Sequence, residues 1–92
     1  MTYLVKFTNE ALKDIDAHKK AGDRNVLRRI EALLLELRLH PREGIGRPEK
    51  LKHNLAGLYS RRITSKHRLV YEIEDEIVTV VVVGAYGHYG DH

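Results

Sequence analysis

The sequence predicts an α+β fold, in which a small antiparallel or mixed sheet of about four to five strands packs against two N-terminal helices. Two observations predict it. Apolar residues recur at helical spacing through the first half of the chain, and after Gly57 the apolar period changes to two. The length of 92 residues allows one two-layer core and is too short for a second domain, so we treat residues 1–92 as a single domain.

A short strand and a helix come first. Residues Tyr3 to Phe7 alternate and are rich in β-forming residues, which predicts the first strand. Thr8 or Asn9 is suited to cap the helix that follows, and Gly22 is suited to end it. Between these ends, apolar residues recur at helical spacing at Ala11, Leu12 and Ile15.

A second helix is predicted to begin at Asp23 and to stop before Pro41, which cannot continue a helix. Its apolar residues form a wide stripe: Val26, Leu27, Ile30, Leu33, Leu34 and Leu37. The next segment, Arg42 to Leu55, combines glycines, Pro48 and charged residues, which predicts a loop across the surface. A loop of this length favours a functional role.

Three runs with strand character complete the chain. Leu58 to Ile63 and Arg68 to Glu74 are predicted to pair, and a turn at Glu74 and Asp75 leads to the third run, Ile77 to Ala85. The third run has almost no polar alternation, which predicts a central strand covered on both faces.

The register of the first two of these strands decides whether two arginines lie together. We expect Arg62 to lie opposite Arg68, because a shift by one residue would mix polar and apolar side chains on both faces. In this register a polar face carries Ser60, Arg62, Arg68, Val70 and Glu72, and a core face carries Tyr59, Leu69, Tyr71 and Ile73. Like charges directly opposite cost roughly 0.2 to 1 kcal/mol unless an anion lies between them, which favours a bound phosphate.

Basic charge is concentrated in one stretch. The residues from Arg47 to Tyr71 hold seven of the sixteen Lys and Arg residues and a single acid, Glu49, whereas the whole chain has a net charge of only +3. The rest of the chain is therefore net negative. Such a stretch predicts a surface that binds phosphates, and an ordinary solvated hairpin is the alternative.

Several of these residues have the chemistry needed to cleave RNA through its own 2′-hydroxyl. That reaction needs a general base, a general acid and cations to hold the phosphate. The residues that could supply them are Glu49, Lys52, Arg62, Arg68 and His88, and each also has an ordinary reading as a solvated side chain. Tyr86 and Tyr89 could stack on bases, and His53 and His67 could bind phosphate.

Other chemistry is not expected. The chain has no cysteine, so disulfides and thiol catalysis are excluded. No helix aligns His88 with His92, and no other pair of ligands completes a metal site there, so we predict no metal and no cofactor. The longest apolar run, Val80 to Val83, is far too short to span a bilayer. We expect a cytoplasmic protein with no membrane partner.

The run GRPEKLKHNLAGLYSRRITSKHRLVYEI at residues 46–73, followed by a valine-rich strand and a terminal His-Tyr, resembles the YoeB/Txe toxins of bacterial toxin–antitoxin systems, within the RelE-like superfamily. The resemblance implies a ribosome-dependent mRNA endoribonuclease that needs no metal and inhibits translation. It implies as partners the 70S ribosome with mRNA in its A site, a Phd/YefM-type antitoxin and possibly a second copy of the chain. Operator DNA is reached only through the antitoxin complex.

The same resemblance implies residue roles. Glu49 is the general base and His88 the general acid. Lys52, Arg62 and Arg68 are phosphate ligands, and Tyr89 positions the substrate.

Two features depart from the family pattern. Relatives carry a basic residue where this chain has Tyr86, and the chain continues past Tyr89 through Gly90 to His92. Two other functions therefore stay open: a ParE-like gyrase poison, and a catalytically inactive module that binds RNA or an antitoxin.

Overall fold

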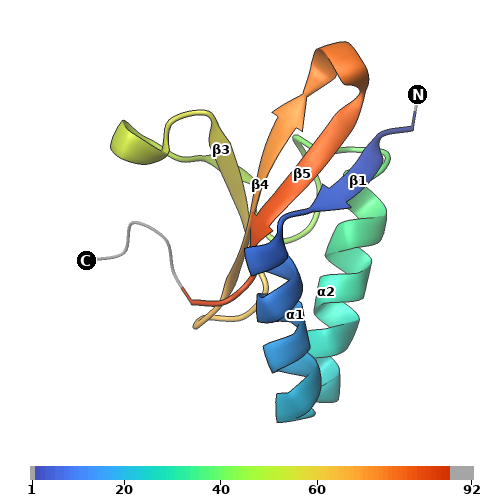
Figure 1. Cartoon of the computed structure of the whole chain (residues 1–92), viewed down its shortest axis with the longest axis vertical. Coiled ribbons are helices and arrows are strands. Elements are labelled where there is room, and N and C mark those ends of the chain that lie inside the picture. Colours follow the sequence, from blue (N-terminus) through green and yellow to red (C-terminus); the bar gives the residue numbers. More distant parts are fainter. Residues whose placement is uncertain (1, 88–92) are drawn as a thin grey trace.

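The computed structural model describes residues 2–87, and it contains a five-stranded mixed sheet with two α-helices against one face (Figure 1). The elements are β1 (Leu4–Phe7), α1 (Asn9–Ala21), α2 (Arg24–Leu37), β2 (Glu49–Lys50), the 3₁₀ turn η1 (His53–Leu55), β3 (Leu58–Arg62), β4 (Arg68–Glu74), the 3₁₀ turn η2 (Asp75–Ile77) and β5 (Thr79–Gly84). The strand order is β1-β5-β4-β3-β2. Strand β1 runs parallel to β5, and the other neighbours are antiparallel. The α+β prediction is confirmed.

The helices begin and end where their capping residues predict. Thr8 rather than Asn9 caps α1, and its Oγ1 accepts a hydrogen bond from the backbone of Ala11 at 3.1 Å. Gly22 ends α1 in the left-handed conformation, with φ of 76°. Asp23 caps α2 through a 2.9 Å hydrogen bond from the backbone of Asn25.

The apolar stripe of α1 differs from the prediction. Leu12 is 51% exposed, so it does not belong to the buried face. The buried face instead runs through Ala11, half-buried Ile15 and His18, which follow one another at intervals of four and three residues. A histidine therefore occupies a core position of this helix.

The core lies between the helices and the sheet. The stripe of α2 packs there as predicted, with Val26, Ile30, Leu33 and Leu37 buried. The strands contribute Leu69, Tyr71, Val80 and Val82, and the residues directly after β3 and β5 add Ile63 and Ala85. Tyr59 and Tyr71 stack with ring centroids 5.8 Å apart. Within residues 2–87, neither helix has the length and apolar character that a membrane span requires.

The predicted register of β3 and β4 is confirmed, because Arg62 is paired with Arg68. We call the sheet face that carries Ser60, Arg62, Arg68, Val70 and Glu72 the open face, since both helices pack against the other one. The residues of this face are those predicted, but its centre is covered, because Ser60 and Val70 are fully buried there.

Three features differ from the sequence prediction. Strand β2 lies inside the segment predicted to be a loop, and it pairs with β3. Strand β5 begins at Thr79, because η2 and the left-handed Val78 (φ 48°) take up the preceding residues. It is an interior strand, between β1 and β4, but β4 is the central one. Its second face is only partly covered, with Val81 and Val83 half-buried.

Candidate functional site

A carboxylate and an arginine meet on the open face. Backbone pairing of β2 with β3 places Glu49 opposite Ser60. Strand β3 lies between Glu49 on β2 and Arg68 on β4. The guanidinium of Arg68 reaches across β3, where Nη1 lies 3.1 Å from Ser60 Oγ and 3.2 Å from Glu49 Oε1. The side chain of Glu49 is 56% exposed, whereas that of Arg68 is 17% exposed. The site thus offers an accessible carboxylate beside a cation that packing holds in place.

Arg62 adds a second cation to this face. It lies opposite Arg68 and is exposed, and within residues 2–87 no ion pair of its side chain is found. Its backbone N–H donates to Gly46 O at 2.7 Å, which ties the end of β3 to the loop that precedes Glu49. The anion beside Arg68 is the carboxylate of Glu49, which offsets the repulsion between the two arginines.

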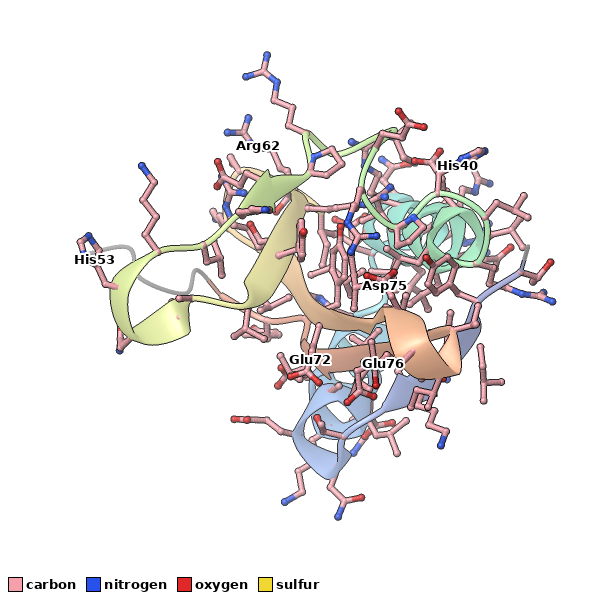
Figure 2. All side chains as sticks on the ribbon, turned by 90° about the horizontal axis from the view of Figure 1, so that it is seen from above. His40, His53, Arg62, Glu72, Asp75 and Glu76 are labelled. Carbon is pink, nitrogen blue, oxygen red and sulfur yellow. The ribbon has the colours of Figure 1, made fainter. Side chains whose placement is uncertain are left out.

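Lys52 and His53 come shortly after the strand that carries Glu49. They follow β2 in a loop that projects beyond the sheet, from Leu51 to Gly57, and both are exposed (Figure 1). Figure 2 shows His53 at the tip of this loop, away from Arg62. Within residues 2–87, no hydrogen bond or ion pair joins the side chain of Lys52 or His53 to Glu49 or Arg68.

Arg61 corrects the charge analysis. It was counted with the phosphate-binding stretch, but its side chain is 0% exposed and lies on the core face. Nη1 donates to Glu36 Oε1 at 2.6 Å, and Nε donates to the Tyr71 hydroxyl at 3.0 Å. Nη1 and Nη2 also donate to backbone carbonyls of the loop before β2, those of His40, Glu43 and Ile45. Its charge is thus neutralised inside the protein.

This buried network fixes the loop that leads to Glu49. Burial raises the pKa of Tyr71 above its ordinary value, against the opposing effect of Arg61, so the phenol stays neutral. Its hydroxyl donates to Pro41 O at 2.8 Å while accepting from Arg61. Glu36 Oε1 also accepts from the backbone of Ile45 at 2.7 Å. Buried side chains of the core therefore hold this loop through hydrogen bonds to the backbone of the loop.

The last described residue lies beside Arg68. The backbone N–H of Arg68 donates to Gly87 O at 3.0 Å. His88 and Tyr89, expected as the general acid and as the residue that positions the substrate, lie outside the described residues. His67, expected as a phosphate ligand, has its Nδ1 3.0 Å from the backbone nitrogen of Gly87.

Ser60 and His18 are two polar residues whose contacts the sequence alone does not reveal. Ser60 was placed on the correct face but not recognised as a partner of Arg68. His18 was not considered, although its spacing of seven residues from Ala11 puts both on the same face of a helix. That spacing is the feature of the sequence that indicates a buried position for His18.

Acidic residues gather elsewhere on the sheet. Figure 2 shows Glu72, Asp75 and Glu76 along β4 and η2, apart from Arg62. Glu72 shares the open face with Arg62 but is paired with Leu58, at the other end of β3. Arg42 Nη2 lies 2.6 Å from Asp75 Oδ2, and this hydrogen bond, assisted by one from Tyr3, holds the pKa of Asp75 below its ordinary value. Within residues 2–87, no group of three or more histidines or acids is arranged to hold a metal ion.

Solved structures of bacterial toxins share this fold. A YoeB/ParE toxin from Agrobacterium tumefaciens matches with a TM-score of 0.86 at 30% identity, over 94% of this chain and 99% of that toxin. The YoeB dimer from Staphylococcus aureus gives 0.80 at 37% identity, over 97% of this chain and 100% of that one. The heterotetrameric complex of YoeB and YefM from the same organism gives 0.79 with the same identity and coverage. The fold is that of a RelE-like toxin of a toxin–antitoxin system.

Sequence comparison narrows this class to one family. The family model described as the YoeB-like toxin of bacterial type II toxin-antitoxin system matches residues 7–89. Toxin YoeB of Escherichia coli strain K12 is 43% identical over 67 residues, which are 73% of this chain and 77% of that toxin. The chain belongs to the YoeB family of type II toxins, which confirms the resemblance found in residues 46–73.

Proposed function

We propose that this toxin is a ribosome-dependent endoribonuclease that cuts messenger RNA in the ribosomal A site by metal-independent acid–base chemistry. The observation that supports it best is the pair of Glu49 and Arg68, 3.2 Å apart on an accessible sheet face. A carboxylate that can accept a proton, next to a guanidinium that can bind phosphate, supplies two of the three groups that cleavage through a 2′-hydroxyl requires, and the third is a general acid.

Each residue takes one step of this reaction. Glu49 accepts the proton of the 2′-hydroxyl, whose oxygen attacks the adjacent phosphorus. Arg68 and Arg62 bind the phosphate oxygens, on which negative charge increases in the transition state. His88 donates a proton to the departing 5′-oxygen, and Tyr89 positions the substrate. Lys52 and His53 bind the RNA backbone further along the projecting loop.

The arrangement also gives a reason for dependence on the ribosome. In the free protein Arg68 is engaged by Glu49, so a substrate must separate the pair before either residue can act. Free RNA would have to do this while losing its own conformational freedom. A message already held in the A site has lost that freedom, and positioning of this kind can contribute about 7 to 11 kcal/mol to lowering a barrier.

We also propose a YefM-like antitoxin as partner and a dimer as an accessible state, because the related toxin from S. aureus was solved both as a dimer and with YefM. Arg47, Lys50, Lys52 and Arg62 are exposed along β2, the end of β3 and the loops beside them. An acidic antitoxin segment would be attracted to these residues, so its association rate should fall as salt is raised. A rate that does not change with salt would place the antitoxin elsewhere.

The direct test is to incubate the purified chain with programmed ribosomes, with the same message free in solution, and with gyrase acting on supercoiled DNA. We expect new message ends at the A-site codon on ribosomes, at least about a hundredfold slower cutting of free message, and no gyrase-dependent DNA breaks. DNA breaks without message cleavage would support a gyrase poison instead. A chain that binds ribosomes and cuts neither substrate would be an inactive binding module.

A further inference from the structure

The segment that follows β5 is anchored to α1 through Ala85. Its backbone N–H donates to Asp14 Oδ2 at 2.9 Å, and its carbonyl oxygen lies 2.7 Å from His18 Nε2. Because a carbonyl can only accept, Nε2 of His18 carries the proton of this bond. Asp14 and His18 are one helical turn apart, and His18 is 3% exposed. One face of α1 thus holds both polar groups of this residue.

Two residues further on, Gly87 is held by the hairpin between β3 and β4. Its N–H donates to His67 Nδ1 at 3.0 Å, and its carbonyl accepts from the backbone of Arg68 at 3.0 Å. Gly87 has φ of 76°, a conformation that suits glycine. His67 Nδ1 must be unprotonated to accept this hydrogen bond. Consecutive residues of the hairpin therefore fix both polar groups of Gly87.

Ring packing holds His67 in place for this contact. Its ring meets that of His18 edge to face, with centroids 4.7 Å apart, and lies 4.4 Å from the ring of Tyr86. The rings of His18 and Tyr86 are themselves 4.8 Å apart. The three rings form one cluster, to which α1, the hairpin and the segment after β5 each contribute one residue.

We propose that His67 is a positioning residue: through Nδ1 it fixes Gly87, and with it the point from which the chain continues to His88. The inference rests on the proposed function, in which His88 is the general acid. Consecutive Cα atoms are about 3.8 Å apart, so a displacement of Gly87 is passed on to the next residue.

Arg68 connects this anchor to the general base. Its backbone N–H holds Gly87, and its guanidinium contacts Glu49. Arg68 thus contacts both the proposed base, Glu49, and Gly87, the residue that precedes the proposed acid. A misplacement of about 1 Å can cost on the order of a hundredfold in rate, so loss of the His67 contact should reduce turnover more than binding.

Two substitutions separate the hydrogen bond from the ring packing. His67→Phe keeps a ring against His18 and Tyr86 but has no acceptor for Gly87. His67→Asn loses the ring but has a side-chain oxygen near the place of Nδ1. His40→Phe, at an exposed histidine near the end of α2, is the matched control.

The readouts are amide hydrogen exchange at Gly87 by NMR and single-turnover cleavage on programmed ribosomes. In His67→Phe we expect amide exchange at Gly87 to be about tenfold or more faster and cleavage to be about tenfold or more slower than in the wild type. The ribosome concentration that gives half-maximal cleavage should stay within about twofold of the wild-type value. His67→Asn should recover part of both, and His40→Phe should change neither.

The outcomes distinguish this inference from the proposed function. Unchanged exchange at Gly87 in His67→Phe, or faster exchange with cleavage at the wild-type rate, overturns the role of His67 alone. A wild-type chain that does not cut message overturns the proposed function and the catalytic part of this inference with it. If His67→Phe does not fold, imidazole ¹⁵N spectra of the wild-type chain decide: unprotonated Nδ1 coupled to the Gly87 amide supports the contact, and protonated Nδ1 overturns it.

Discussion

Arg61 and Arg62 are adjacent in the sequence and should have opposite roles. The substitution Arg61→Met removes the guanidinium whose partners are Glu36, the Tyr71 hydroxyl and three backbone carbonyls. Removing one partner of a buried ion pair typically costs about 3 to 5 kcal/mol. Because Glu36 is 25% exposed and can regain water, we expect a value toward the lower end of that range.

The matched substitution Arg62→Met removes an exposed side chain, and such changes are usually within about 0.5 kcal/mol. For a domain of this size, 1 kcal/mol shifts the unfolding temperature by about 4 to 8 °C. Thermal unfolding followed by circular dichroism should therefore show Arg61→Met at least about 12 °C below the wild type, and Arg62→Met within a few degrees. Equal unfolding temperatures in the two variants would refute the buried role of Arg61.

A double-mutant cycle sharpens the test. Replacing Glu36 by Gln in the Arg61→Met background removes the carboxylate that has lost its partner, so it should restore part of the lost stability. Strictly additive losses would show that the two side chains do not stabilise each other.

Two further predictions concern the loop and the end of the sheet. Gly44→Ala should destabilise the protein more than Gly57→Ala in urea unfolding. Both glycines have positive φ, so both substitutions strain the backbone. An added Cβ would lie 1.5 Å from Glu36 Oε1 at Gly44, whereas it would meet nothing within 4 Å at Gly57. Equal costs would mean that backbone strain alone matters. The pKa of Asp75 is lowered mainly by its hydrogen bond with Arg42. The ionised carboxylate therefore stabilises the fold when the pH is above its ordinary pKa of about 3.9, and this contribution is lost as the pH falls through the folded-state pKa. Asp75→Asn should therefore lower the unfolding temperature at pH 7, and the difference should disappear once the pH is below the folded-state pKa of Asp75. A difference that persists in acid, where Asp75 is protonated, would exclude a charge effect.

Periodicity predicted most of the fold because it reflects which face is buried. The stripe of α2 and the register that pairs Arg62 with Arg68 both follow from keeping apolar side chains on one face. Strand β2 could not be found in this way, since two residues carry no period. It forms because the backbone of Glu49 and Lys50 meets that of β3.

The site was harder to predict for a different physical reason. A count of charges does not say which side of a strand each one occupies, so the basic stretch includes Arg61 although this residue shares a buried face with Tyr59 and Leu69. Whether a buried arginine or histidine is tolerated depends on partners distant in sequence. Arg61 needs Glu36, and His18 needs the carbonyl of Ala85. Such partners become known only when the fold brings them together.

The central claim is that Glu49 acts as a base toward message on the ribosome. The most direct measurement is single-turnover cleavage on programmed ribosomes by Glu49→Gln, with ribosome binding measured in parallel. Glu43→Gln is the control, because it removes the same charge from the same region of the chain at a side chain that is 82% exposed. We predict that Glu49→Gln cuts about 10² to 10⁴ times more slowly while binding ribosomes normally, and that Glu43→Gln cuts like the wild type. Cleavage by Glu49→Gln at the wild-type rate would contradict the account.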